Sequence, residues 1–484
     1  MNEREKLLID QAYKEVEQYR NTVVSDPYRL TYHIMPDVGL LNDPNGFIRF
    51  KGEYHLFYQW NPFQTAHGAK FWGHYTSTDL VHWNHEPIAL APSEWYEKNG
   101  CYSGSAVEKD GNMFLFYTGN VKDGSGNRET YQCMAISKDG VNFEKKGPVI
   151  MLPPGYTAHF RDPKVWKEHD KWYMIVGAQS ENKEGKAVLF CSDNLSHWEH
   201  LGPIAGTNMN GLGEFGYMWE CPDLFALNEK AVLIVSPQGL EPQGDMYHNL
   251  FQSGYFVGEI DYEKVHFKHG AFTELDRGFD FYAPQTTLDE KGRRLMFAWM
   301  GITDDQEPYH PTIQHRWIHA MTLPRELVLN GSKLYQKPVQ ELQNLRRNEV
   351  SHECIELTKR DVSFEKIEGQ SIELKVNTMK LEGEMFDILF RDNARFVYDP
   401  VRQRASFERK RFNDNMWEAR HCQLDKLEKL QVFMDTSSIE IFINDGEEVF
   451  TSRIYPNVNN SSIRFSVKGK AAFNLQKWDL RNTP

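Results

Sequence analysis

Three acidic residues stand shortly before prolines, each where an apolar, strand-like run begins. They are Asp43 in NDPNG (42–46), Asp162 in FRDPK (160–164) and Glu220 in WECPD (219–223). A single acid before a proline usually caps a turn. Two carboxyl groups that meet at one site can instead cleave a glycoside: one stays protonated and donates to the leaving oxygen, and the other attacks as a nucleophile or activates water. The choice between these interpretations depends on whether the chain brings the three acids together.

A regular repeat runs through the first two thirds of the chain. Five short β-rich runs, each after a polar turn, look alike: 52–59, 111–118, 171–178, 230–237 and 292–299. When they are aligned on Phe57, Phe116, Ile175, Ile234 and Phe297, the first three intervals are equal and the last is slightly longer. A second signature, seen in STDLVHW (77–83) and SDNLSHW (192–198), recurs about one strand later. Regular repeats of several short strands predict a β-propeller, here with five blades.

Two histidine pairs in this second signature have the spacing of metal ligands. They are His82-x-x-His85 and His197-x-x-His200, and both stand at the same point of the repeat, beside a tryptophan. This placement favours a role in blade packing. No other zinc-type or calcium-type cluster is visible, and we expect neither a metal nor another cofactor.

The three acids fall at one register of the repeat. Asp43, Asp162 and Glu220 precede the aligned positions of their blades by the same interval, to within a single position. Equivalent positions of a propeller lie on one ring around its axis, so we expect these acids to meet at the mouth of the central channel. Converging carboxylates are costly and typical of functional sites. Cys221 follows Glu220, and we expect it to be a small buried neighbour, because no histidine falls at this register to activate it.

Residues near this ring are suited to a sugar, whose faces stack on aromatic rings and whose hydroxyls need polar partners. The candidates for substrate contact are Gln59, Trp60, Phe71, Trp72, Tyr102, Ser103, Tyr282 and Trp299. Together with the acids they favour carbohydrate chemistry.

Composition and charge argue against several other classes of protein. The net charge is −13, which makes nucleic acid and anionic membrane surfaces poor partners. No stretch approaches the roughly 18–20 apolar residues of a membrane span. The first twenty residues predict an amphipathic helix with Leu8, Ala12 and Val16 on one face, and they do not resemble a signal peptide. The six cysteines are scattered singly, which is typical of reduced thiols in a cytoplasmic protein.

The predicted organisation is an all-β chain with two domains. Residues 1–25 form an N-terminal helix, 26–336 the five-bladed β-propeller, 337–350 a linker and 351–484 a β-sandwich. The second domain shows alternating strands and an Asn444-Asp445-Gly446 hairpin turn but no acid cluster. We therefore assign it packing or homo-oligomer contacts.

Several of these motifs resemble glycoside hydrolase family 32, the family of invertases, fructan hydrolases and sucrose-6-phosphate hydrolases. HIMPDVGLLNDPNG (33–46), FRDPK (160–164) and WECPDL (219–224) are similar to its three acidic motifs. FWGHYTSTDLVHW (71–83), YSGSA (102–106) and DTSSIEIFINDGEEVFTSRIYP (435–456) resemble it as well, so the resemblance covers nearly the whole chain.

The resemblance implies that Asp43 is the nucleophile, Glu220 the acid/base and Asp162 a transition-state stabiliser that holds fructosyl hydroxyls, with Arg161 beside it. It implies further substrate contacts from Asn42, Gln59, Tyr102 and Ser103, a retaining reaction through a covalent fructosyl-enzyme, and no cofactor. The charge of Arg161 is expected to keep Asp162 ionised.

The resemblance also suggests sucrose 6-phosphate as the substrate of a cytoplasmic member. The segment 61–74 departs from the pattern of secreted invertases, which usually have a tryptophan near His67. A phosphate dianion in so acidic a protein needs a local cation. Lys70 is the candidate, with His67 as a helper.

Three alternatives stay open. One is a hydrolase of plain sucrose or of fructans such as inulin or levan, without a phosphate preference. Another is an inverting arabinan-type hydrolase, which would share the three acids but hold its carboxylates farther apart. The third is a non-catalytic, carbohydrate-binding propeller, in which the ring acids would be dispensable.

Overall fold

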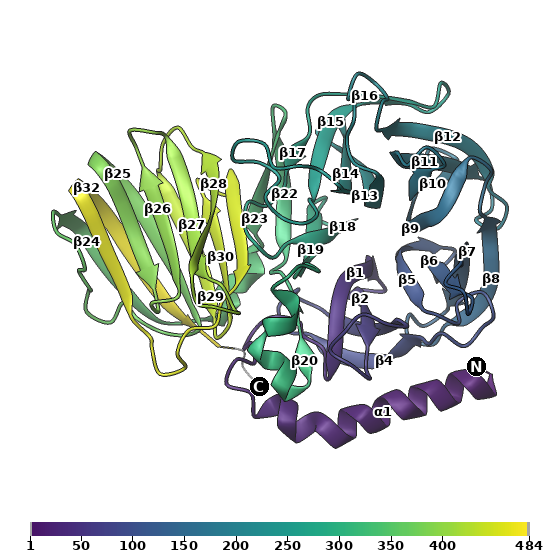
Figure 1. The fold of residues 1–484 in the computed structure, drawn as a ribbon, viewed down its shortest axis with the longest axis horizontal. Helices are drawn as coiled ribbons and strands as arrows, with labels where there is room; N and C mark the ends of the chain where they lie inside the picture. Colours follow the sequence, from purple (N-terminus) through teal and green to yellow (C-terminus); the bar gives the residue numbers. More distant parts are fainter. Residues whose placement is uncertain (1, 482–484) are drawn as a thin grey trace.

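The computed structural model describes residues 2–481, and it is an all-β molecule of two parts with one long helix (Figure 1). A five-bladed β-propeller lies beside a β-sandwich that is nearly closed into a barrel, as the sequence predicts. The helix α1 (Glu3–Val24) runs along one side of the propeller. Among the described residues, no helix is long and apolar enough to cross a membrane.

Each blade is an antiparallel sheet built from consecutive strands. Blade I contains β1 (Gly39–Phe50), β2 (Glu53–Asn61), β3 (Phe71–Ser77), β4 (Asn84–Leu90) and, at its edge, β20 (Trp317–Ile318). Blade II contains β5 (Cys101–Lys109), β6 (Asn112–Lys122), β7 (Arg128–Ser137) and β8 (Glu144–Met151). Blade III contains β9 (Tyr156–Glu168), β10 (Lys171–Ser180), β11 (Gly185–Ser192) and β12 (Glu199–Gly206).

The last two blades are less regular. Blade IV contains β13 (Met218–Leu227), β14 (Lys230–Gln238), β15 (Gly254–Asp261), β16 (His266–His269) and β17 (Thr273–Glu274). Blade V contains β18 (Tyr282–Leu288), β19 (Arg294–Met300), β21 (Ala320–Met321), β22 (Arg325–Asn330) and β23 (Lys333–Pro338). Two 3₁₀ helices, η1 (Glu307–Tyr309) and η2 (Pro311–His315), interrupt blade V. β20, which lies between β19 and β21 in the chain, pairs in parallel with β1, so a segment within blade V closes the ring onto blade I.

The five aligned runs of the repeat are the second strands of the blades, β2, β6, β10, β14 and β19. The first strands, β1, β5, β9, β13 and β18, carry the ring positions. The repeat therefore predicts the number of blades and the register of their inner strands correctly.

The second signature is the turn between the third and fourth strands. Asp79 accepts hydrogen bonds from the backbone N–H groups of Val81 and His82, and Asn194 does the same in blade III. The indoles of Trp83 and Trp198 each donate to a carbonyl three residues earlier. His82 and His197 therefore belong to turns that close the blades. His85 and His200 lie in the strands that follow, and Nε2 of His85 is 2.9 Å from the Tyr75 hydroxyl.

The helix α1 begins at a side-chain cap, since Oδ1 of Asn2 accepts from the N–H of Glu5 at 2.7 Å. Ala12, Val16 and Val23 are its buried residues. Two of the three apolar positions that predict the helix are thus in the core, and the third, Leu8, packs against it partly buried.

The sandwich domain is one continuous sheet of nine strands folded onto itself. They are β24 (Arg346–Leu357), β25 (Ile372–Phe390), β26 (Ala394–Asp399), β27 (Arg404–Lys410), β28 (Trp417–Gln423), β29 (Lys429–Asp435), β30 (Ser438–Ile443), β31 (Glu448–Arg453) and β32 (Ile463–Leu480). The long strands β25 and β32 pair along most of their length, with two register shifts, which let them bend from one layer to the other. The segment 337–350 contains the 3₁₀ helix η3 (Gln340–Leu345), and β24 already begins at Arg346.

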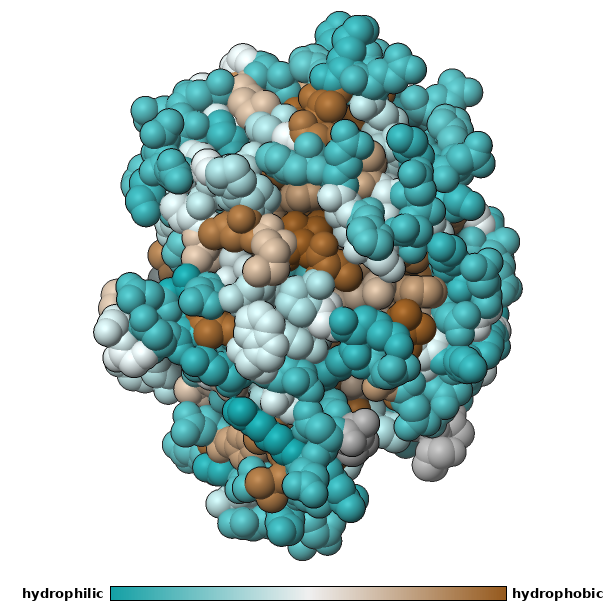
Figure 2. Space-filling view, turned by 90° about the vertical axis from the view of Figure 1, so that its right-hand side faces the viewer, coloured by the Kyte–Doolittle hydropathy of each residue, from teal (hydrophilic) through white to brown (hydrophobic). Residues whose placement is uncertain are grey.

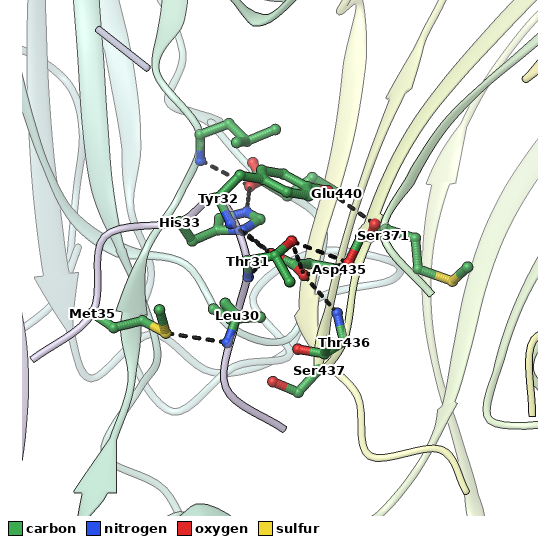
Figure 3. A network of polar contacts seen from close by, with 12 residues as sticks. Leu30, Thr31, Tyr32, His33, Met35, Ser371, Asp435, Thr436, Ser437 and Glu440 are labelled. Carbon is green, nitrogen blue, oxygen red and sulfur yellow. Dashed lines mark hydrogen bonds and ion pairs between the residues drawn. The ribbon is translucent and has the colours of Figure 1, made fainter. Parts of the chain in front are cut away.

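A buried ionic network joins the two domains (Figure 3). Nδ1 of His33 lies 2.9 Å from Oδ2 of Asp435, and its Nε2 lies 3.2 Å from Oε1 of Glu440. The other oxygen of Glu440 accepts from Arg325 at 2.6 Å, and Arg325 also pairs with Asp276 at 3.0 Å. The side chains of these five residues are at most 1 % exposed. The histidine precedes the propeller strands and its acids belong to the sandwich, so the network fixes one domain against the other.

The face of the molecule at the right of Figure 1 is mainly hydrophilic (Figure 2). Hydrophobic residues on it gather in small areas between hydrophilic ones, which is ordinary for a globular protein. All six cysteines are free.

Candidate active site

The ring acids stand on β-bulges. The ladder between the first and second strands shifts register at the ring position of every blade: between Leu41 and Pro44, Tyr102 and Gly104, Arg161 and Lys164, Glu220 and Asp223, and Tyr282 and Gln285. Four of these five bulges contain a proline, which has no N–H to lose from the ladder. A bulge re-aims its side chain. The acid-before-proline motif is therefore the device that turns a side chain into the channel.

A cavity of about 520 Å³ opens at this ring. Its lining includes Asn42, Asp43, Gln59, His67, Lys70, Tyr102, Arg161, Asp162, Glu220, Tyr282 and Trp299. It also includes Gly68, Ala69, Asn99, Asn120, Lys122, Arg128, Gln238, Phe251, Ile302 and Thr303. The structure thus brings the three predicted acids to one cavity, with polar groups and a few apolar ones around them.

Asp43 is held by neutral donors. Ser103 Oγ donates to its Oδ2 at 2.5 Å, and Asn42 Nδ2 donates to its Oδ1 at 3.0 Å. Gln59 ties this pair together, since it accepts from Asn42 and donates to Ser103. Burial raises the pKa of Asp43, the Ser103 hydrogen bond opposes this, and the charge of Glu220 adds to the rise. The donors fix the carboxylate while leaving it without a direct cationic partner.

Glu220 has the most strongly ionising surroundings of the three. Nε and Nη2 of Arg161 donate to its Oε1 at 2.8 and 2.5 Å. Gln238 Nε2 and the Tyr282 hydroxyl each donate to its Oε2 at 2.7 Å. Burial alone would raise the pKa of Glu220, but the charge of Arg161 and these hydrogen bonds outweigh it and hold the pKa below its ordinary value.

Asp162 is the acid whose pKa is raised most. Its Oδ2 accepts from the backbone N–H of Cys221 at 3.0 Å. Burial and the charge of Glu220 raise the pKa of Asp162 to about 7, against the opposing charge of Arg161. The prediction that Arg161 keeps Asp162 ionised is therefore wrong, because the guanidinium bonds Glu220 of the next blade instead of its sequence neighbour.

Cys221 lies between two of the acids. Its sulfur is 3.6 Å from Oδ2 of Asp162 and 3.9 Å from Oδ2 of Asp43. Burial raises the pKa of its thiol well above the ordinary value, so it is a poor nucleophile and packs as a small neighbour.

Lys70 and His67 line the same cavity as Asp43, and Lys70 is close enough to Asp43 for the two charges to interact. The ammonium of Lys70, a residue only 3 % exposed, is 3.2 Å from Nδ1 of His67. Nε2 of His67 reaches Oε1 of Glu307 at 3.2 Å and the hydroxyl of Thr303 at 3.0 Å. Burial lowers the pKa of Lys70 to about 7, although the nearby charge of Asp43 opposes this. Both candidate phosphate ligands thus face the cavity next to the predicted nucleophile.

Four predicted substrate contacts, three aromatic residues and Ser103, do not line the cavity, and for them the prediction is wrong. Trp60 and Phe71 pair across β2 and β3 in the hydrophobic core, 3 % and 1 % exposed. Trp72 is fully buried, and its indole donates to the carbonyl of Tyr102 at 3.1 Å. These aromatic residues are close to the ring of acids along the chain, but side chains alternate between the two faces of a strand. An aromatic side chain that points away from the propeller axis packs between blades. Ser103 does not line this cavity either; it acts on Asp43.

Several lining residues were missed from the sequence. An amide stands four residues after the aligned position in each of the first four blades, at Asn61, Asn120, Gln179 and Gln238. Two of these amides, Asn120 and Gln238, line the cavity, so this periodicity is a signal that was available. Lys122 and Arg128 face each other at the end of the β6–β7 hairpin, outside the motifs that repeat, and only the fold brings them to the cavity.

Within residues 2–481, no three His, Cys, Asp or Glu side chains are arranged to hold a metal ion. The donors and acids present are those of proton transfer and sugar binding. Two partly buried carboxyl groups share the cavity: Asp43, which faces neutral donors, and Glu220, which faces a guanidinium, so the site holds the pair of carboxyl groups that glycoside cleavage requires.

Comparison with known proteins agrees with this chemistry. Residues 33–338 match the family model of the glycosyl hydrolases family 32 N-terminal domain, and residues 341–479 match the family 32 C-terminal model. A sucrose-6-phosphate hydrolase of Bacillus subtilis is 56% identical over 471 residues, 97% of this chain and 98% of the relative. A sucrose-6-phosphate hydrolase of Salmonella typhimurium is 44% identical, over 91% of each chain.

Solved structures share the whole architecture. The sucrose-6-phosphate hydrolase of Lactobacillus gasseri superposes with a TM-score of 0.87 at 32% identity, over 97% of this chain and 96% of the other. A mutant of the Bombyx mori GH32 β-fructofuranosidase, in complex with sucrose, superposes with a TM-score of 0.86 at 34% identity, over 100% and 99% of the two chains.

Proposed function

Because the chain belongs to glycosyl hydrolases family 32 and is a glycoside hydrolase, we propose that it hydrolyses sucrose 6-phosphate to glucose 6-phosphate and fructose. The observation that carries the chemistry is the convergence of Asp43, Asp162 and Glu220 on one cavity. The phosphorylated substrate is supported by the relatives at 56% and 44% identity.

In the first step, Asp43 attacks the anomeric carbon of the fructosyl group and Glu220 protonates the leaving glucosyl oxygen. The C–O bond to glucose breaks and a covalent fructosyl ester forms on Asp43. In the second step, Glu220 takes a proton from water, which attacks the same carbon and releases fructose and the carboxylate of Asp43. Two displacements retain the configuration, and this mechanism requires the two carboxyl groups to lie about 5–5.5 Å apart.

The proton for Glu220 has a source in the substrate-free site. Asp162, whose pKa is raised to about 7, holds a proton more readily than Glu220, which Arg161 keeps ionised. Fructosyl hydroxyls that donate to Asp162 would stabilise its ionised form and lower its pKa. The negative charge that Asp162 gains when it ionises raises the pKa of Glu220, so the proton moves to Glu220 and substrate binding prepares this acid for catalysis.

The sugar contacts follow from the cavity. Asn42, Gln59 and Arg161 offer hydrogen bonds to fructosyl hydroxyls, and Tyr102 and Tyr282 offer a ring and a hydroxyl. Trp299 supplies an apolar wall for a sugar face. Ser103 contributes indirectly, by orienting Asp43.

A phosphorylated disaccharide is a charged molecule that arises inside a cell during phosphotransferase uptake, so we place the enzyme in the cytoplasm. The proposal involves no nucleic acid, membrane or cofactor, because the chain is acidic and carboxyl groups alone transfer the protons. The sandwich domain serves packing or homo-oligomer contacts.

The test is to incubate the purified protein with sucrose 6-phosphate, sucrose, inulin and arabinan, and to analyse the products and their initial anomeric configuration. The expected result is the highest kcat/KM for sucrose 6-phosphate and retention at the fructosyl carbon. Equal kcat/KM for sucrose and its phosphate would indicate an ordinary invertase, and inversion on arabinan would replace the mechanism. Binding without cleavage of any of the four would indicate a carbohydrate-binding propeller.

A further inference from the structure

Two cations face each other at one rim of the active cavity. Lys122 ends β6, Arg128 begins β7, and the two are directly opposed in the antiparallel ladder. Opposed residues project from the same face of a sheet with Cβ atoms roughly 4.5–5.5 Å apart, and like charges at such a position are destabilising. Both residues line the cavity that contains the three acids. Two like charges that face each other in the substrate cavity are suited to bind an anionic ligand, which would neutralise them.

No acid of the described chain is in ion-pair contact with either cation. Neither side chain has an ion pair or hydrogen bond to another described residue. The adjacent acids are occupied elsewhere: Asp123 accepts from Ser125 and Asn127 within its own turn, and Glu129 accepts from the Tyr131 hydroxyl at 2.6 Å. In a protein of net charge −13, two neighbouring cations without acidic partners are unusual. They present one ammonium and a whole guanidinium to the cavity.

Two asparagines hold the backbone next to Lys122 in place by hydrogen bonds. Oδ1 of Asn99 accepts from the N–H of Lys122 at 2.7 Å, and Asn120 Nδ2 donates to the carbonyl of Asn99 at 3.2 Å. This leaves Nδ2 of Asn99, another cavity residue, without an acceptor among residues 2–481. Arg128 is half-buried, with its guanidinium carbon 5.9 Å from the centre of the Tyr102 ring. The rim therefore offers an amide donor and two cations on a supported hairpin.

The chemistry of the proposed reaction places the leaving glucosyl group on the side of the cavity where Lys122 and Arg128 lie. The glucosyl oxygen must lie against Glu220, and Arg128 is close enough to Glu220 and Arg161 for their charges to act on it. Lys70 instead lies against Asp43 and His67, where the fructosyl half must sit. A phosphate on the glucosyl group therefore meets the β6–β7 hairpin before it meets Lys70.

We infer that Lys122 and Arg128 bind the 6-phosphate of the leaving glucosyl group and set the preference for the phosphorylated substrate. Arginine offers a planar fork for two phosphate oxygens, and lysine adds a point charge. Lys70 then acts on the fructosyl side as a positioning residue for Asp43. This inference rests on the proposed function.

The experiment compares the ratio of kcat/KM for sucrose 6-phosphate to that for sucrose in the wild type, Lys122→Met, Arg128→Met and Lys70→Met. Each rim variant should lower the ratio about tenfold to hundredfold, the loss of one charge-assisted phosphate contact. Lys109→Met is the matched control, because this lysine lies at the opposite end of blade II, outside the cavity. Thermal unfolding verifies that each variant is folded.

The outcomes separate the inference from the function on which it rests. A wild-type ratio near one overturns the phosphate preference and, with it, the inference. A high wild-type ratio that both rim variants retain overturns the inference alone. A ratio lost only in Lys70→Met moves the phosphate to the Asp43 side. Raising the ionic strength should lower the ratio of kcat/KM values in the wild type, since exposed charges are screened. The ratio should stay nearly constant in a double variant that carries both Lys122→Met and Arg128→Met.

Discussion

Arg161 bonds Glu220 across the boundary between blades III and IV, through Nε and Nη2 at 2.8 and 2.5 Å from Oε1, and not the Asp162 that follows it in the chain. The bulge at Asp162, with its φ of +67°, separates the directions of the two neighbouring side chains. The proposed acid/base is thus the acid whose pKa is held below its ordinary value, and the pKa of the proposed hydroxyl binder is raised to about 7. This arrangement determines how each acid should respond to mutation and pH.

The two catalytic carboxyl groups should differ in their dependence on the leaving group. Glu220→Gln should lower kcat for sucrose by several orders of magnitude, because a sugar alkoxide leaves slowly without a proton. The loss of kcat/KM, which reports the formation of the fructosyl-enzyme, should be much smaller for a fructoside with a nitrophenolate leaving group, which needs no proton. Asp43→Asn should lose activity on both substrates equally, since it removes the nucleophile. If both variants lose both activities to the same extent, the assignment of Glu220 as acid is incorrect.

Removing the donors of Glu220 should move the basic limb of the pH profile. Arg161→Met takes away the cation that holds the pKa of Glu220 down, so this pKa should rise. The protonated acid then persists to higher pH, and the basic limb of kcat/KM should move upward even though the rate falls. Tyr282→Phe removes one hydrogen bond and should shift the limb in the same direction by less. An unmoved limb in both variants would show that another group is the acid.

The repeat predicts much of this site because a propeller converts sequence register into position. Asp43, Asp162 and Glu220 could be grouped from their spacing alone, since equivalent residues meet around the axis. The partner of Arg161 could not, because a bulge decides the direction of a side chain. Trp60 and Phe71 were placed wrongly for a related reason: proximity along the chain does not state which face of a strand packs on the core. Lys122 and Arg128 were missed because they stand at the end of the β6–β7 hairpin, outside the motifs that repeat between blades.

Asp162 should weaken the folded state at neutral pH. Its folded pKa of about 7 lies above the ordinary value of roughly 3.9. A carboxyl group with a raised pKa favours the folded protein at low pH, and this contribution is lost as pH rises from about 4 to 7. Asp162→Asn removes the titration but keeps an oxygen for the Cys221 N–H. The variant should therefore gain Tm relative to wild type at pH 8 more than at pH 5, while losing activity. An equal difference in Tm at both pH values would contradict the raised pKa.

His33 should make the junction between the domains sensitive to alkali. Burial alone would lower the pKa of His33, but its hydrogen bonds to Asp435 and Glu440 outweigh this, and the net pKa is raised. A histidine with a raised folded pKa contributes its full stability below the unfolded value of about 6.5 and loses it as pH rises through the folded value. His33→Gln should cost about 3–5 kcal/mol at pH 6, the usual cost of leaving a buried acid unpaired.

The measurement for His33 is thermal unfolding of wild type and His33→Gln at pH 6 and pH 9, with the exposed His266→Gln as the control. The gap in Tm between wild type and His33→Gln should narrow from pH 6 to pH 9, because the wild-type histidine loses its proton as pH rises through its raised pKa while Asp435 and Glu440 stay ionised, their pKa values being lowered in the fold. The control should show no gap at either pH. A gap that stays constant from pH 6 to pH 9 would contradict a titration of His33 in this range.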